Sequence, residues 1–186
     1  MLGEVLRALS EPKVSLAEAR TKTSASPGLY AIHGGPAEWK DLGLGIPADN
    51  RPLYVGKSES SLISRDVHTH FGDGRTGQST ARRSFAALLR GKLDLRGIPR
   101  NPANPGYFAN FGLSPEDDAK LTAWMRMHLL LSTWVPSESI VLRDIERDVI
   151  MRWEPPLNLT HVATPWTLRV VQARRVMANQ ARAWRP

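Results

Sequence analysis

The sequence contains no cysteine among its 186 residues. This absence excludes disulfide-stabilised scaffolds, zinc sites built on thiolates and cysteine nucleophiles. It suits a reducing compartment, so we expect a cytoplasmic protein. The sequence also lacks any run of about 18 apolar residues, the length that a membrane-spanning helix needs, so we expect no membrane partner. Residues 1–13 include acids and have no long apolar stretch, so we expect no signal peptide.

Acidic residues are scarce relative to basic ones. The chain has 25 lysines and arginines against 18 acids, a net charge of +7. The excess is uneven: residues 161–186 contain five arginines and no acid, and residues 65–100 contain eight basic residues against three aspartates. Such a balance favours a polyanionic partner, either nucleic acid or an acidic membrane surface, and the alternative is a solvated basic face without a partner.

Apolar spacing and turn residues divide the chain into short strands and helices of mixed order. Strand-like runs occupy residues 29–32 and 53–55, and a loop rich in Gly, Pro and Asp over 33–51 separates them. We expect these two runs to pair antiparallel and residues 130–135 to form a third strand. Helices are predicted within 1–22 and over 61–71, 81–90, 115–128, 139–153 and 166–184. The predicted class is therefore α+β, with helices flanking a small antiparallel sheet of about three strands.

Four short motifs occur in a recognisable order. They are Pro27-Gly28-Leu29-Tyr30, Leu53-Tyr54-Val55-Gly56-Lys57-Ser58, Leu62-x-x-Arg65 followed by His70-Phe71, and Glu146 with Pro155-Pro156-Leu157-Asn158. Over residues 27–159 this set resembles the GIY-YIG nuclease superfamily. The first two motifs look like the family's paired signature strands, although a long loop joins them here where the family usually has a short hairpin. Glu146 stands twelve residues before Asn158, a spacing similar to that in the incision nuclease of bacterial nucleotide-excision repair.

The resemblance assigns the family's arginine to Arg65, on the helix predicted after the second strand. The family often has a histidine or tyrosine one turn later, and His68 and His70 are both candidates. We favour His70, because an aromatic residue, Phe71, follows it as one commonly does in the family.

The resemblance implies a catalytic set that activates water and neutralises phosphate charge. Glu146 would hold a divalent cation, Mg²⁺ or Mn²⁺; the structural alternative is a surface ion pair with Arg143 or Arg147. Tyr30 or Tyr54 would act as general base if nearby cations favour its phenolate form, and the sequence does not distinguish between them.

Three further side chains would complete this set. Arg65 would bind phosphate oxygens in a bidentate manner, and Lys57 would supply a compact point charge. Asn158 would orient a strand end or a partner rather than transfer protons.

Residues 75–84 form the first of two candidate contacts with nucleic acid. They combine hydroxyl residues with Arg75, Arg82 and Arg83 at a predicted helix start, where a phosphate can bind. The alternative is an ordinary capped helix with a solvated arginine pair.

The predicted helix 166–184 is the second candidate contact. Its apolar residues Leu168, Val171 and Val176 would pack on the domain, which leaves a basic face with Arg174 and Arg175 for DNA. A protein partner or a membrane surface are alternative ligands of such a helix.

These observations predict a helical extension at 1–26, a GIY-YIG-like nuclease domain at 27–160 and a basic helix at 161–186 that packs on the same domain. The predicted function is a metal-dependent DNA endonuclease that acts on double-stranded DNA as a restriction or defence enzyme. Cutting both strands would favour either a homodimer or sequential nicking. Two other hypotheses are a nucleic-acid-binding module that has lost activity and a domain whose arginine-rich helix binds another protein.

Overall fold

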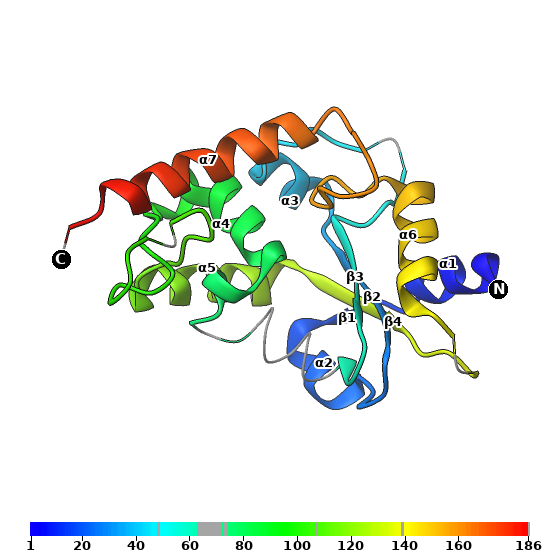
Figure 1. The fold of residues 1–186 in the computed structure, drawn as a ribbon. Coiled ribbons are helices and arrows are strands. Elements are labelled where there is room, and N and C mark those ends of the chain that lie inside the picture. The colour runs from blue at the N-terminus through cyan, green and yellow to red at the C-terminus, as the bar shows by residue number, and fades with distance from the viewer. Residues whose placement is uncertain (48, 63–71, 73, 107, 139, 186) are drawn as a thin grey trace.

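A computed structural model describes residues 1–47, 49–62, 72, 74–106, 108–138 and 140–185 (Figure 1). One antiparallel sheet has the strand order β1-β4-β2-β3, from β1 (Val14–Ser15), β2 (Gly28–His33), β3 (Tyr54–Ser58) and β4 (Leu130–Trp134). The predicted antiparallel pairing of the two signature strands is confirmed, despite the long connection between them. The unpredicted strand β1 has two residues, too few to produce an alternating pattern.

Helices make up most of the remaining regular structure, which confirms the α+β class. They are α1 (Leu2–Ser10), α2 (Leu16–Lys22), α3 (Pro36–Asp41), the short 3-10 helix η2 (Thr76–Gln78), α4 (Thr80–Leu93), α5 (Pro115–His128), α6 (Leu142–Trp153) and α7 (Thr167–Ala183). The helix predicted over 61–71 lies almost entirely outside the described residues.

Strand β2 is buried along its whole length because helices cover both faces of the sheet. Leu29 and Ala31 point toward α1 and α6 and share a hydrophobic cluster with apolar residues of those helices. Tyr30 and Ile32 point the other way, into a larger cluster with α4 and α5. Figure 1 shows the sheet between these two groups of helices. The period-two alternation of a strand therefore decides which side chains of β2 and β3 share a face.

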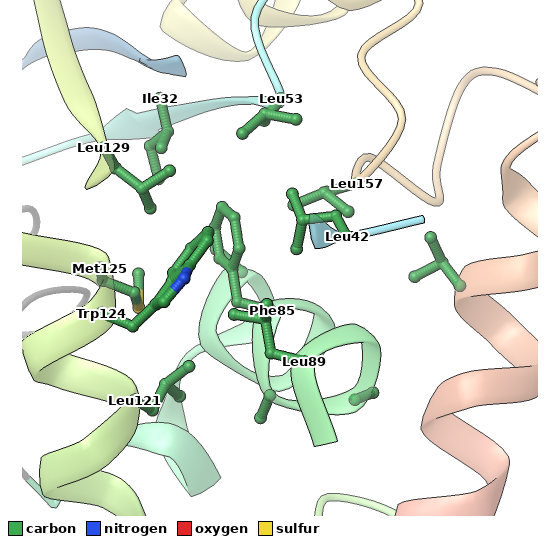
Figure 2. Packing of buried hydrophobic residues seen from close by; sticks show 14 of the residues in the cluster. Ile32, Leu42, Leu53, Phe85, Leu89, Leu121, Trp124, Met125, Leu129 and Leu157 are labelled. Carbon is green, nitrogen blue, oxygen red and sulfur yellow. The ribbon is translucent and has the colours of Figure 1, made fainter. Parts of the chain in front are cut away.

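The larger cluster is centred on two aromatic side chains (Figure 2). Phe85 of α4 and Trp124 of α5 lie with ring centroids 6.3 Å apart. Burying a side chain as large as Phe85 contributes about 1.5–3 kcal/mol to folding. This packing joins α4 and α5 to the sheet and thereby fixes the position of the start of α4.

A serine caps the start of each of these helices. The Ser79 hydroxyl accepts a hydrogen bond from the Arg82 amide at the start of α4, and the Ser114 hydroxyl accepts one from the Asp117 amide at the start of α5. Pro115 occupies the first turn of α5, where its missing N–H costs nothing.

Helix α7 packs along α4, but not through the predicted residues. Leu168, Val171 and Val176 are exposed, and the buried side is made by four other residues, Val170, Ala173, Met177 and Ala181. The predicted apolar face was wrong because Val176 lies five residues after Val171, a spacing that leaves one helix face. The buried set keeps spacings of three and four residues, which stay on one face.

Candidate active site

The register of β2 and β3 brings two predicted catalytic tyrosines together. Tyr54 is opposite Ile32, and Tyr30 is opposite Gly56, so both phenol rings lie on the same face of the sheet. Their ring centroids are 6.1 Å apart. Tyr30 is fully buried, whereas Tyr54 is partly exposed. Of the two tyrosines, Tyr54 is therefore the one with access to solvent.

Position 56 has no room for a side chain larger than that of glycine, because the ring of Tyr30 lies across it. A Cβ atom at position 56 would lie 2.5 Å from Tyr30 Cζ and 3.0 Å from Cε1, closer than packed carbon atoms approach. The glycine of the second motif therefore makes room for the tyrosine of the first.

Asn158 is buried against the outer strand of the sheet. Its Oδ1 accepts a hydrogen bond from Val55 N at 2.9 Å, and its Nδ2 donates to Val55 O at 2.8 Å. β3 is the outermost strand of the sheet that the described residues form, so no strand of that sheet pairs with these backbone groups. The amide thus takes the place of a further strand and holds the segment that carries Tyr54.

The turn after α6 places Asn158 next to Val55 at the outer edge of β3. Glu154 ends α6 in a left-handed conformation with φ of 48°, and Pro155 and Pro156 prevent the helix from continuing. The Leu157 amide then donates to Leu53 O at 3.0 Å, just before the two bonds of Asn158. The proline-rich motif therefore works as a clamp on β3.

Glu146 and Lys57 are found on the face of the sheet opposite to the one that carries Tyr30 and Tyr54. Helix α6 buries Ile145, Val149 and its other apolar residues against that face, and Glu146 borders this stripe and is half-buried. Lys57 follows Val55 on the same face by strand alternation, and its ammonium group forms an ion pair with Glu59.

One of the two arginines named in the surface alternative for Glu146 forms ion pairs with other carboxylates of α6. Arg147 pairs with Asp144 at 3.6 Å and with Asp148 at 3.4 Å.

Two arginines from separate helices lie within electrostatic reach of Tyr54. Burial, followed by the positive charges of Arg174 and Arg100, lowers the pKa of Arg83 to about 10, and Tyr54 acts in the opposite direction. Burial also lowers the pKa of Arg174, again opposed by Tyr54. Both arginines stay positively charged at neutral pH. Residues from α4, α7 and β3 therefore form one cationic environment around a phenol.

Arg82 does not belong to this group, and its assignment to nucleic-acid binding is corrected. Its side chain is fully buried and forms an ion pair with Asp118 at 3.2 Å. Its Nη2 also donates to the Thr122 hydroxyl at 2.9 Å, and its Nε to the Thr76 hydroxyl at 3.1 Å. A guanidinium group enclosed in this way cannot reach a phosphate.

Asp118 is the residue of this region that the sequence analysis missed. It accepts hydrogen bonds from the amides of Gly74 and Arg75 and from the Thr76 hydroxyl, in addition to its ion pair with Arg82. It thereby fixes the chain that leads into α4. The available signal was its place three and four residues before the buried Leu121 and Thr122, on the inward side of α5.

The other predicted contacts are either exposed or outside the described residues. Arg75 is exposed, with Nη1 donating to Gln78 at 3.2 Å, and Arg175 is exposed on α7. Arg65 and both histidine candidates, His68 and His70, lie outside the described residues.

Comparison with known families decides the family of the chain. A family model, the GIY-YIG catalytic domain, matches residues 46–175, more than half of the chain. The chain belongs to the GIY-YIG family. The match runs from the segment before β3 into α7, so it includes Tyr54, Glu146, Asn158 and Arg174, whereas Tyr30 precedes it. No curated protein and no solved structure matches the chain.

A GIY-YIG catalytic domain has nuclease-type activity, and nucleases of this family generally use a divalent metal ion. The described residues contain no group of three or more His, Asp or Glu side chains that could hold a metal ion. A half-buried Glu146 nevertheless fits Mg²⁺, which commonly uses one or two carboxylates and completes its shell with water and substrate phosphate. Within the described residues, every helix is too short or too polar to cross a bilayer.

Proposed function

We propose that this GIY-YIG protein is a divalent-metal-dependent endonuclease that hydrolyses DNA phosphodiester bonds. The observation that carries the proposal is the position of Tyr54, on an edge strand with Arg83 and Arg174 within electrostatic reach. A phenol next to cations is suited to proton transfer, and arginines next to it are suited to phosphate.

Tyr54 is the general base in this proposal. The electrostatic attraction between a phenolate and a guanidinium group is mutual, so the two arginines that interact with Tyr54 favour its negatively charged form. That form accepts a proton from the attacking water. Tyr30 is fully buried, so it does not contact the attacking water. Its ring packs against Gly56 and thereby helps to position β3.

Glu146 holds the metal ion, Mg²⁺ or Mn²⁺. Such an ion, when bound, stabilises charge on the phosphate and on the leaving oxygen. Helix α6 packs on β3, so Glu146 and Tyr54 flank the same edge strand from its two faces. We place the scissile phosphate at this outer edge of the sheet.

The other members of the predicted catalytic set keep auxiliary roles. Lys57 adds positive charge, Arg65 binds phosphate oxygens, His70 assists at the leaving group and Asn158 holds β3. The nucleic-acid contacts of the proposal are Arg75, Arg83, Arg174 and Arg175. We propose double-stranded DNA as the substrate, a restriction or defence role in the cytoplasm, and a homodimer for cutting both strands.

The test is cleavage of plasmid and single-stranded DNA with Mg²⁺, with Mn²⁺ and with a chelator. Glu146→Gln removes the metal-binding charge, and Asp148→Asn removes a carboxylate of the same helix that pairs with Arg147 at the surface. We expect cleavage to need the metal, to fall about 10²–10³-fold in Glu146→Gln and to persist in Asp148→Asn.

Well-folded wild-type protein that binds DNA but cuts no substrate would contradict the proposal. That result would identify a nucleic-acid-binding module that keeps the fold without the activity.

A further inference from the structure

Arg83 and Arg174 are buried or half-buried cations without a carboxylate partner among the described residues. Arg83 is only 7% exposed, and its Nη1 and Nη2 donate to uncharged acceptors, Gly77 O at 2.9 Å and the Thr80 hydroxyl at 3.2 Å. Arg174 is half-buried and has no hydrogen bond or ion pair to another described residue. Removing a charge from water without a counter-charge is unfavourable, so this arrangement needs an explanation.

A third cation lies next to them. Arg100 is exposed, and its side chain packs against Gly77, the residue whose carbonyl oxygen accepts from Arg83. Arg83 is repelled by both Arg174 and Arg100, and α7, which carries Arg174, packs along α4, which carries Arg83. Like charges gathered around Arg83 favour an anion there.

Arg83 also has an unused hydrogen-bond donor. Its Nε is buried and has no partner, whereas buried polar groups in folded proteins are nearly always hydrogen-bonded. Arg83 lies in the first turn of α4, a helix of 14 residues with no acidic residue in that turn. A cation is unfavourable at this positive end of a helix, and an anion is favourable.

We propose that Arg83 and Arg174, with Arg100 at the entrance, form a phosphate-binding subsite that holds a backbone phosphate of the nucleic acid next to the one that is cut. The inference rests on the proposed function, and it makes α7 a part of the substrate-binding site. Without substrate the subsite has no carboxylate counter-charge among the described residues, and the bound phosphate supplies one.

The test compares Arg174→Gln with Arg7→Gln, which makes the same charge change at an exposed position of α1, on the other side of the sheet. In chloride, Arg174→Gln has a melting temperature equal to or above that of the wild type, because it relieves repulsion within the cluster. Inorganic phosphate, compared with chloride at equal ionic strength, raises the melting temperature of the wild type and of Arg7→Gln but not of Arg174→Gln.

The second readout is the affinity for a short DNA duplex, measured with chelator over a range of salt concentrations. Arg174→Gln weakens binding about tenfold and reduces the slope of log affinity against log salt by about one, as expected for one lost phosphate contact. Arg174→Lys keeps the charge without the bidentate geometry and restores part of the affinity.

Two results would overturn the subsite: an Arg174→Gln protein that is destabilised or unfolded in chloride, or one that binds phosphate and DNA like Arg7→Gln. Loss of the phosphate response with unchanged DNA affinity would show a site for free phosphate and would also contradict the inference. Cleavage that depends on Glu146 while Arg174 has no effect leaves the nuclease function intact. Phosphate binding through Arg174 in a protein that never cuts DNA leaves the subsite intact.

Discussion

The side-chain amide of Asn158 forms hydrogen bonds with both backbone groups of Val55, which lies 103 residues earlier in the chain. The bonds are 2.9 and 2.8 Å long and are buried. They secure the edge strand β3, which carries Tyr54, on the side where the described part of the chain provides no further strand.

Replacing this amide tests the clamp. Asn158→Ala leaves a buried N–H and C=O of Val55 without partners, and we expect a loss of about 1–3 kcal/mol in the free energy of unfolding. Urea denaturation measures it. The nearly isosteric Asn158→Asp should not restore stability, since it turns an oxygen toward Val55 O. Asn179→Ala, at an exposed position of α7, is the control, and equal stability losses in the two alanine variants would refute the clamp.

The contact between Gly56 and Tyr30 predicts a coupled pair of substitutions. Gly56→Ala places a Cβ atom against the phenol ring, and we expect it to destabilise the protein by about 1–3 kcal/mol through overpacking. Tyr30→Ser removes the ring and should cancel most of that cost. A double-mutant cycle measured by denaturation gives the coupling energy. Additive effects would show that the ring does not require the glycine.

Much of the fold could be predicted from local signals. The tyrosine-bearing strands and the helices predicted over 81–90 and 115–128 depend on apolar spacing and turn residues within a few positions, and these elements are found where they were expected. The order of the motifs also identified the family. These features depend on the spacing of residues along the chain and not on contacts between residues that are far apart in the sequence.

The wrong predictions concern which of several similar residues is buried, and tertiary contacts decide this. Adjacent arginines Arg82 and Arg83 look alike in sequence, but Arg82 is the one that pairs with Asp118 of a distant helix. In α7, two sets of apolar residues compete for the inward side, and packing against α4 selects the set with Val170 and Met177. The sequence alone predicts neither the burial of Arg82 nor the set of α7 residues that faces α4.

The buried ion pair between Asp118 and Arg82 predicts a large effect on stability. Asp118→Asn leaves the fully buried guanidinium group without its counter-charge and should cost about 3–5 kcal/mol. Glu116→Gln, at an exposed ion pair two residues earlier, should cost less than about 1 kcal/mol. Urea denaturation of both variants checks this difference, and similar values would contradict the assigned role of Asp118.

His33 predicts a loss of stability on acidification. Its Nε2 lies 2.9 Å from the Ser132 hydroxyl and 3.1 Å from Leu9 O, and burial, with the charge of Lys13, lowers its pKa from 6.5 to about 4. Between these two pH values the unfolded chain binds the proton and the folded protein does not. The stability due to neutral His33 is therefore complete above pH 6.5 and falls by about 3 kcal/mol as the pH drops to 4.

Denaturation midpoints measured across this pH window test the assignment. A His33→Gln variant, which cannot titrate, should lose most of the pH dependence between pH 6.5 and 4, even if it is less stable throughout. An unchanged dependence in the variant would assign the effect to other groups.

The most direct test of the account is single-turnover DNA cleavage by the wild type and by Tyr54→Phe across a range of pH, with Mg²⁺ present. If Tyr54 is the general base, the wild-type rate rises with pH until the phenol is ionised. The Tyr54→Phe rate is then lower by about 10²–10⁴-fold and loses that rise, while DNA affinity stays the same. A Tyr54→Phe protein that cuts DNA at the wild-type rate, with the same pH profile, would contradict the account.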